Sequence, residues 1–294
     1  MWLLVKLLAV AVVYGTAIEP RIVVREDHAG SIPALPASWE GKQVAVFADL
    51  QIGMWWANTD AVRRAVAKTV ELRPAFVLIA GDFVYKAEHE VDPLMQEVLA
   101  LLQPLIDAKI PTYAVLGNHD YEMMNEGSRM ETSIARRVRF ALDSAGIHMM
   151  DNRAVPVWAP GADSATSGPL YIVGIGDKWA LNDSSAAAVA KVPAGAPRIV
   201  FMHDPDSYAH IPANQAPLAI AAHTHGLQIG IPWVSDWLWR EYFSDEGAEV
   251  QGWVNNFGQP GNRLYINRGI GFSILPGRIN AFPELTVFTL TRAP

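Results

Sequence analysis

The sequence predicts an α/β protein in which short β-strands alternate with α-helices. Two observations support this: β-rich runs recur from residue 43 to the C-terminus, and the early runs are separated by stretches with apolar residues at three- and four-residue spacing. Strands that alternate with helices form layered sheets, whose ligands gather at the carboxyl ends of the strands. The predicted strands span residues 44–50, 76–80, 112–116, 170–175, 198–202, 218–222, 264–266 and 285–290, and the predicted helices span residues 60–72, 92–108 and 128–144.

The composition narrows the classes of function. The 294 residues include 23 Lys and Arg and 30 Asp and Glu, which gives a net charge of −7. A broad nucleic-acid-binding face needs clustered basic residues, so no nucleic-acid partner is expected. The absence of cysteine excludes disulfides, thiolate zinc sites, iron–sulfur clusters and cysteine nucleophiles. Any metal must therefore be held by His, Asp, Glu, Asn or Gln.

The N-terminus begins with a strongly apolar segment. Residues 1–18 contain one charged side chain, Lys6, and a membrane-spanning helix needs about 20 apolar residues. We expect a hydrophobic helix that serves as an uncleaved membrane anchor over residues 1–20, with a cleaved signal peptide or a core helix as alternatives. Because Arg21 and Arg25 follow this segment, the positive-inside rule favours a cytoplasmic body. Residues 21–42, with Pro33 and Pro36, are predicted to be a tether, and residues 43–294 to be the domain.

Polar side chains able to bind a metal follow five of the predicted strands. A single Gly-Asp pair is usually a turn, and a lone histidine after a strand is usually structural. Each motif by itself is therefore weak evidence of a metal site. Their coincidence at five strand ends predicts a metal centre, and the ligand types suit Mn²⁺, Fe²⁺, Zn²⁺ or Co²⁺. The residues concerned are Asp49 and Gln51, then Asp82, then Asn118, His119 and Asp120, then His203, and finally His223 and His225.

These motifs, in this order, resemble the signature of the calcineurin-like metallophosphoesterases. That signature runs D-x-H, G-D, G-N-H-D, a lone H and G-H-x-H, and the resemblance extends from residue 43 to the C-terminus. The apolar N-terminus and the C-terminal tail are most similar to the membrane-anchored bacterial phosphodiesterase branch of the YkuE and YaeI type. The resemblance implies a four-layer αββα sandwich and a dinuclear metal-dependent phosphoester hydrolase at the bacterial inner membrane.

The resemblance also implies roles for individual residues. One metal ion would be held by Asp49, Gln51, Asp82 and His225, and the other by Asp82, Asn118, His203 and His223, with Asp82 shared. His119 would stabilise or protonate the leaving oxygen, and Asp120 would orient the ring of His119. A turn or helix cap is the alternative role for Asp120.

Two positions depart from the family pattern. Gln51 stands where the family has histidine, and Ala222 stands where it has glycine. Either Gln51 binds a metal through its amide oxygen, or it only donates and accepts hydrogen bonds. Because an amide oxygen is a harder ligand than imidazole, Gln51 as a ligand favours Mn²⁺ over Zn²⁺ or iron.

Other residues carry weaker expectations. Arg268 and Arg278 are candidates for binding the phosphate, and salt-bridged arginine is the alternative. Residues 231–243 are rich in aromatic side chains, and Trp233, Trp237 and Trp239 are expected to contact a membrane; the alternative is a lid packed on the protein's own core.

The sequence therefore predicts a phosphodiester or diphosphate hydrolase that acts at a membrane on a phosphoester substrate. Analogy with membrane-bound relatives singles out a lipid-linked nucleotide, UDP-2,3-diacylglucosamine. The alternatives are an inactive membrane-tethered scaffold on the same fold, a phosphodiesterase for soluble substrates, and a hydrolase of a bond without phosphate.

Overall fold

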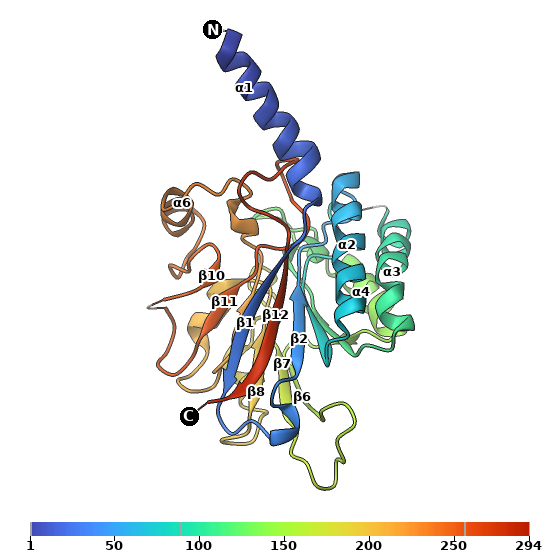
Figure 1. Cartoon of the computed structure of the whole chain (residues 1–294), viewed down its shortest axis with the longest axis vertical. Helices are drawn as coiled ribbons and strands as arrows, with labels where there is room; N and C mark the ends of the chain where they lie inside the picture. The colour runs from blue at the N-terminus through green and yellow to red at the C-terminus, as the bar shows by residue number, and fades with distance from the viewer. Residues whose placement is uncertain (1, 89, 256, 294) are drawn as a thin grey trace.

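Two β-sheets lie face to face at the centre of the protein, as the computed structural model shows for residues 2–88, 90–255 and 257–293 (Figure 1). Met1 and Pro294, the first residue of the predicted anchor and the last of the predicted domain, lie outside these described residues. The strand order of the first sheet is β1 (Val24–Ile32), β12 (Glu284–Arg292), β2 (Gln43–Phe47), β3 (Phe76–Ala80), β4 (Thr112–Val115) and β5 (His148–Met149). The strand order of the second sheet is β10 (Gly252–Trp253), β11 (Leu264–Ile266), β9 (Ala219–Ala221), β8 (Arg198–Phe201), β7 (Leu170–Gly174) and β6 (Arg153–Val157).

Both sheets are mainly parallel, as expected for strands joined by helical crossovers. Strands β2 to β5 are parallel neighbours, and so are β7, β8, β9 and β11. The antiparallel pairs are β12 with β2, β6 with β7 and β10 with β11. The prediction of an α/β protein is confirmed.

The alternation of side chains along β2 builds two cores at once. Val44 and Val46 pack between the sheets, while Ala45 and Phe47 face the helices on the outer side. Helices α2 (Trp56–Leu72), α3 (Val91–Asp107) and α4 (Thr132–Ser144) cover that outer face, and Figure 1 shows them side by side on one flank.

The outer face of the second sheet has a thinner cover. Val173 and Val200 pack there against α5 (Ser185–Val189) and against Tyr208 of the short helix η5 (Pro205–His210). The predicted order of layers is therefore present, with helices α2 to α4 on one side and short helical segments and loops on the other.

The tether predicted over residues 21–42 is wrong where strand β1 lies. Val24–Ile32 pairs with β12 in parallel along its whole length and forms the edge of the first sheet. The charged residues Arg25, Glu26 and Asp27 obscured this strand in the sequence. An edge strand tolerates such residues because one of its sides and part of its face meet water.

The apolar N-terminus forms helix α1 (Trp2–Val13), which projects away from the sheets (Figure 1). Its side chains include exposed Trp2, Leu3 and Leu8. Within the described part of the chain, no helix is both long enough and apolar enough to cross a membrane. The chain continues through η1 (Tyr14–Ile18) and η2 (Glu19–Arg21), where Gly15, Glu19 and Pro20 are buried.

Candidate metal centre

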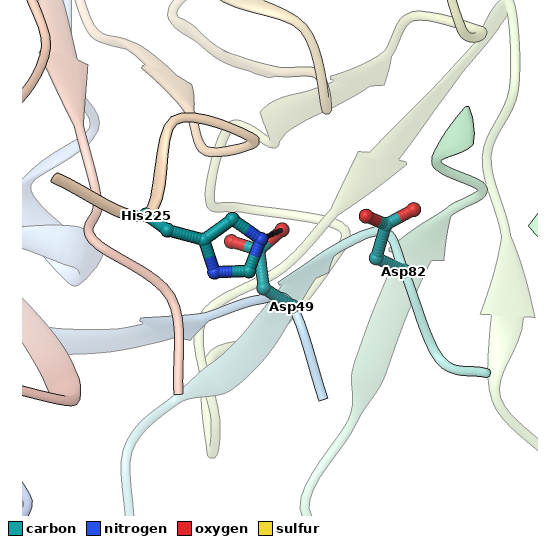
Figure 2. Close-up of side chains that lie close together, drawn as sticks. All are labelled: Asp49, Asp82 and His225. Carbon is teal, nitrogen blue, oxygen red and sulfur yellow. Dashed lines mark ion pairs between the residues drawn. The ribbon is translucent and has the colours of Figure 1, made fainter. Parts of the chain in front are cut away.

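Three ionisable side chains converge where strands from the two sheets end. Asp49 follows β2, Asp82 follows β3, and His225 follows β9 of the other sheet; one ligand atom from each lies within 4.8 Å of the others. Figure 2 shows the Asp49 carboxylate close to the His225 ring, with Asp82 on the neighbouring strand. The Nε2 atom of His225 is 3.6 Å from Oδ1 of Asp49. These residues fit one half of the predicted site.

The second half is built around Nε2 of His203. This atom lies 3.1 Å from Oδ1 of Asn118, 3.1 Å from Nδ1 of His223 and 3.3 Å from Oδ2 of Asp82. The other ring nitrogen of His203 donates to the carbonyl of Ala80 at 2.8 Å, which aims Nε2 at the cluster. The structure therefore brings together the second predicted ligand set, with Asp82 common to both halves.

Gln51, the departure from the family pattern, is buried beside Asp82. Its amide nitrogen donates to Oδ2 of Asp82 at 2.7 Å, and its amide oxygen is buried without a protein partner. Both carboxylate oxygens of Asp49 are also buried without a hydrogen-bond donor. Buried oxygens without donors are costly unless a cation or water satisfies them. The residues present therefore fit hard or borderline divalent cations.

The backbone at these residues is held in an uncommon conformation. Positive φ angles occur at Asp49 (54°), Gln51 (51°), Asp82 (57°), His223 (71°) and His225 (52°). Non-glycine residues adopt this region at a cost in free energy, and such residues cluster at functional sites. Backbone hydrogen bonds maintain it, since the amide of Asp49 donates to Gly81 and the amide of Gln51 donates to Asp82.

Two glycines of the signature motifs leave the room that this packing needs. A Cβ atom on Gly117 would lie 2.3 Å from Oδ1 of Asp82, and one on Gly81, whose φ is +90°, would lie 2.7 Å from Nδ1 of His203. A side chain at either position would therefore displace a metal ligand.

The electrostatics of the first half also suit a cation. Burial raises the pKa of Asp49 to about 7, and the Asp82 carboxylate acts in the same direction. Burial and the Arg278 guanidinium lower the pKa of His225 to about 3, so its ring is neutral, as a metal ligand must be. A divalent cation would stabilise the ionised form of Asp49.

In the second half, His203 and Asp82 shift the pKa of one another. Burial alone would lower the pKa of His203, but Asp82 and Asp49 raise it well above its ordinary value. For Asp82 the directions are reversed. Burial alone would raise the pKa of this carboxyl group, but His203 and His119 hold the pKa below its ordinary value. Burial and His203 lower the pKa of His223. A cation bound here would lower the pKa of His203 and keep its Nε2 atom unprotonated, as a metal ligand must be.

His119 lies at the edge of this cluster. Its backbone amide donates to Oδ1 of Asp82 at 2.9 Å, and its Nδ1 atom is buried without a partner. Its ring packs at a tilt of 46° against Tyr85, with the ring centroids 4.9 Å apart. Burial lowers the pKa of the ring. The predicted role of His119 as an acid stays a prediction.

Asp120 does not orient the His119 ring, so that prediction is wrong. Its carboxylate accepts hydrogen bonds from the backbone amides of Asp82 (3.1 Å), Phe83 (2.9 Å), Val84 (3.2 Å) and Gly117 (3.0 Å). Asp120 therefore ties the loop after β3 to the loop after β4. The alternative prediction, a turn cap, describes its contacts.

The two arginines proposed to bind phosphate are engaged within the protein. Arg278 has 0% exposure, and its guanidinium donates to the carbonyls of Ala281 and Arg268, each at 2.7 Å. Direct phosphate contact is therefore wrong for Arg278. Arg268 pairs with Glu26 at 2.9 Å and with Glu284 at 2.8 Å, which is the salt-bridged alternative.

A cavity of about 340 Å³ opens over Asp82, Asn118 and the two histidines after β9. Besides the predicted site residues, it is lined by Asn125, Thr224, Gln228 and Ser273 and by seven apolar side chains: Met124, Trp179, Leu227, Trp239, Phe243, Ile274 and Leu275. Trp239, in helix α6 (Val234–Tyr242), is 6% exposed and stacks on Phe243, so membrane contact is wrong for this tryptophan. Trp233 and Trp237 are 86% and 53% exposed and stay candidates.

Some residues near the site escaped the sequence analysis. Trp179 packs edge-on against the His223 ring at 4.9 Å, and Ile274 and Leu275 form part of the cavity rim. Asp177 is fully buried, and burial raises its pKa to about 8. These residues lie on loops without a local motif, and only the positive φ of Ile274 marks an unusual backbone.

The chain is similar in sequence to known proteins. Residues 42–227 match the family model for calcineurin-like phosphoesterases. Phosphodiesterase YaeI of Escherichia coli is 29% identical over 77% of this chain and 74% of its own length. YkuE of Bacillus subtilis, an uncharacterized metallophosphoesterase, is 22% identical over 94% and 88% of the two chains. The UDP-2,3-diacylglucosamine pyrophosphatase LpxG of Chlamydia trachomatis is 24% identical over 88% and 87%.

The family match covers more than half of the chain. It includes all seven predicted ligands, since the last of them, His225, precedes the end of the match at residue 227. The order of motifs along the chain and their convergence at the strand ends agree with that match. This protein therefore belongs to the calcineurin-like phosphoesterase family and is a metallophosphoesterase, a hydrolase of phosphoester bonds.

Proposed function

We propose that this protein hydrolyses a phosphodiester or diphosphate bond with two divalent cations, Mn²⁺ in preference to Zn²⁺, iron or Co²⁺. The observation that carries the proposal is the set of buried oxygens without donors, on Asp49 and Gln51, beside the Nε2 atoms of His203 and His225. Asp49, Gln51, Asp82 and His225 would hold one cation, and Asp82, Asn118, His203 and His223 the other. When bound, such a pair polarises a phosphoester oxygen and lowers the pKa of water.

The chain supplies the rest of the chemistry. Asn118 is fixed by its hydrogen bond to the Met123 carbonyl at 2.6 Å, which keeps its amide oxygen aimed at the cluster. His119 lies beside the cavity, where a bound phosphate would raise the pKa of its ring and allow it to protonate the leaving oxygen. Gly81 and Gly117 allow the close packing of these groups, and the positive φ angles of the backbone fix their directions. The groups are therefore in place before substrate binds.

We further propose that the substrate is lipid-linked and is met at a membrane. Three features support this: the seven apolar side chains that line the cavity, the exposed Trp233 and Trp237, and the exposed apolar side chains of α1. Ile229 pairs with Ile279 in an isolated β-bridge, and the Ile279 side chain lies against Gly15, which follows α1. These features therefore lie at the same end of the protein. Trp and Tyr favour the membrane interface. LpxG, a relative of similar length, makes UDP-2,3-diacylglucosamine the specific candidate, cleaved at the cytoplasmic face of the inner membrane.

Turnover by the purified full-length chain in detergent micelles tests the proposal. Metal-free protein is reloaded with Mn²⁺ and given UDP-2,3-diacylglucosamine, a chromogenic phosphodiester or a soluble nucleoside diphosphate sugar, with Asp82→Asn as the inactive control. Release of UMP from the lipid substrate is the expected result. Turnover of the chromogenic diester alone would leave a phosphodiesterase for soluble substrates. Metal binding without any turnover would favour the inactive scaffold.

A further inference from the structure

A fully buried arginine lies behind one half of the metal centre. The Arg278 guanidinium donates to the carbonyls of Arg268, Gly271 and Ala281, and to the carbonyl of His225 at 3.3 Å. One of its nitrogens is also 3.4 Å from Nδ1 of His225, the ring nitrogen that faces away from the cluster. Arg278 therefore holds the backbone of His225 directly, and it holds the ring through the Gly271 carbonyl, which accepts from Arg278 and from Nδ1 of His225.

The same arginine fixes the segment that encloses Asp49. The amide of Gly271 donates to the Asp49 carbonyl at 2.6 Å, and the carbonyl of Gly271 accepts from Arg278 and lies 3.1 Å from Nδ1 of His225. A Cβ atom on Gly269 would lie 2.3 Å from Oδ2 of Asp49, so this segment touches the carboxylate itself. A shift of residues 268–271 would therefore move both Asp49 and His225.

The loop that carries Arg278 is held by the N-terminal segment. The amide of Arg278 donates to the Gly15 carbonyl at 2.8 Å, and the amide of Ala281 donates to Oε1 of Glu19 at 2.8 Å. Glu19 has 0% exposure, and a Cβ atom on Gly277 would lie 2.7 Å from the Gly15 carbonyl. Residues 14–21 thus hold the loop on both sides of Arg278.

From these contacts we infer that residues 14–21, acting through Arg278, position the Asp49–His225 half of the metal centre and set its affinity for a cation. The inference rests on the two-metal site proposed above. Arg278 is a positioning residue, since it does not face the cavity. The Asn118–His203–His223 half receives none of these hydrogen bonds from Arg278 and should be unaffected.

Two variants in the full-length chain test the inference. Arg278→Met removes the guanidinium, and Glu19→Ala removes the acceptor for the Ala281 amide. Partners that orient metal ligands typically contribute about 10- to 100-fold in metal affinity. We expect calorimetric titration of metal-free protein with Mn²⁺ to show one of two sites weakened by that factor in both variants. The electron paramagnetic resonance signal of coupled Mn²⁺ ions should give way to that of a single ion at limiting Mn²⁺.

Matched controls separate positioning from general stability. Arg198→Met removes another buried arginine, which lies at the start of β8 and away from the metal centre. Its guanidinium donates to the carbonyls of Val189, Pro193 and Ala196. Glu40→Ala removes another carboxylate that accepts a backbone amide, that of Arg292 at 2.8 Å. Both controls should keep two wild-type sites, and Glu19→Gln, which keeps the acceptor oxygen, should restore the weakened site.

Two results would overturn the inference. One is Glu19→Ala with both Mn²⁺ affinities within threefold of wild type, which stays measurable even if Arg278→Met does not fold. The other is an equal loss at both sites. A wild-type chain that binds fewer than two Mn²⁺ ions would instead overturn the proposed function, together with the inference built on it.

Discussion

The amide nitrogen of Gln51 donates a 2.7 Å hydrogen bond to Oδ2 of Asp82, which leaves the amide oxygen of Gln51 buried without a protein partner. The hydrogen bond fixes which atom of Gln51 points away from Asp82. An oxygen directed in this way is suited to bind a cation beside Asp49. The departure from histidine at this position is therefore compatible with two metal ions.

Gln51→His should change the metal preference. Imidazole is a softer ligand than an amide oxygen, so the ratio of Zn²⁺ affinity to Mn²⁺ affinity should rise while hydrolysis continues. Competitive titration of the metal-free protein with the two ions measures this ratio. An unchanged ratio would mean that Gln51 only donates its hydrogen bond to Asp82.

Asp82→Asn should remove both metal ions and abolish turnover. One carboxylate is common to both halves of the site, because its oxygens lie near Gln51, His119 and His203. Metal analysis of the purified variant measures the loss. As a contrast, Asn118→Ala removes a ligand from the second half only, so one ion per chain should remain. Two ions per chain in Asp82→Asn would contradict the shared role.

His119→Ala and Asp120→Asn should have different effects. Loss of a general acid typically lowers kcat by about 100- to 10,000-fold, and His119→Ala should do this with normal metal content. Asp120→Asn should instead lower the free energy of unfolding by about 1–3 kcal/mol, since a neutral amide cannot accept all four backbone amides. Steady-state kinetics, metal analysis and denaturant unfolding distinguish them. Loss of metal in His119→Ala would argue that the ring is a ligand.

The buried Asp177 should make the protein less stable as pH rises. Burial raises the pKa of Asp177 from its ordinary 3.8 to about 8, so the folded state keeps a proton that the unfolded state has released. The stability due to neutral Asp177 is therefore complete below about pH 4 and is lost as pH rises to about 8, with a slope of up to about 1.4 kcal/mol per pH unit. Asp177→Asn should reduce this slope.

Denaturant unfolding between pH 5 and 8, with a chelator present, measures the dependence for wild type and variant. The chelator is needed because a cation would change the titration of the neighbouring ligands. Equal slopes for the two proteins would show that Asp177 ionises in the folded state without cost.

Deleting residues 1–13 should release the protein from the membrane fraction. This deletion removes α1 but keeps Gly15 and Glu19, which hold the loop at Arg278. Fractionation of cells that express each form measures the release. If the shortened protein still sediments with lipid, Trp233→Ser with Trp237→Ser should release it, because stable attachment generally takes two signals. A full-length chain found free of membranes would contradict the proposal of membrane attachment.

The sequence determined the candidate ligands and the strands that precede them. Strands Phe76–Ala80 and Leu264–Ile266 have the bounds that were predicted, because apolar runs bounded by turn residues mark buried strands. The seven candidate ligands follow strand ends, and parallel strands bring their carboxyl ends to a common edge. This part of the site is local in origin, and the order of its motifs also identified the family.

Tertiary packing decided what the polar residues near the site contact. Asp120 is next to His119 in the sequence, yet its oxygens meet amides 36 to 38 residues earlier, because the loops after β3 and β4 pack together. Arg278 was expected to bind phosphate and Trp239 to contact a membrane, but both side chains are buried. Strand β1 exists through its pairing with β12, at the far end of the chain. Sequence spacing fixes which residues share a strand or a turn, but the partner of a buried polar atom depends on which distant segments meet it, and only the folded chain determines that.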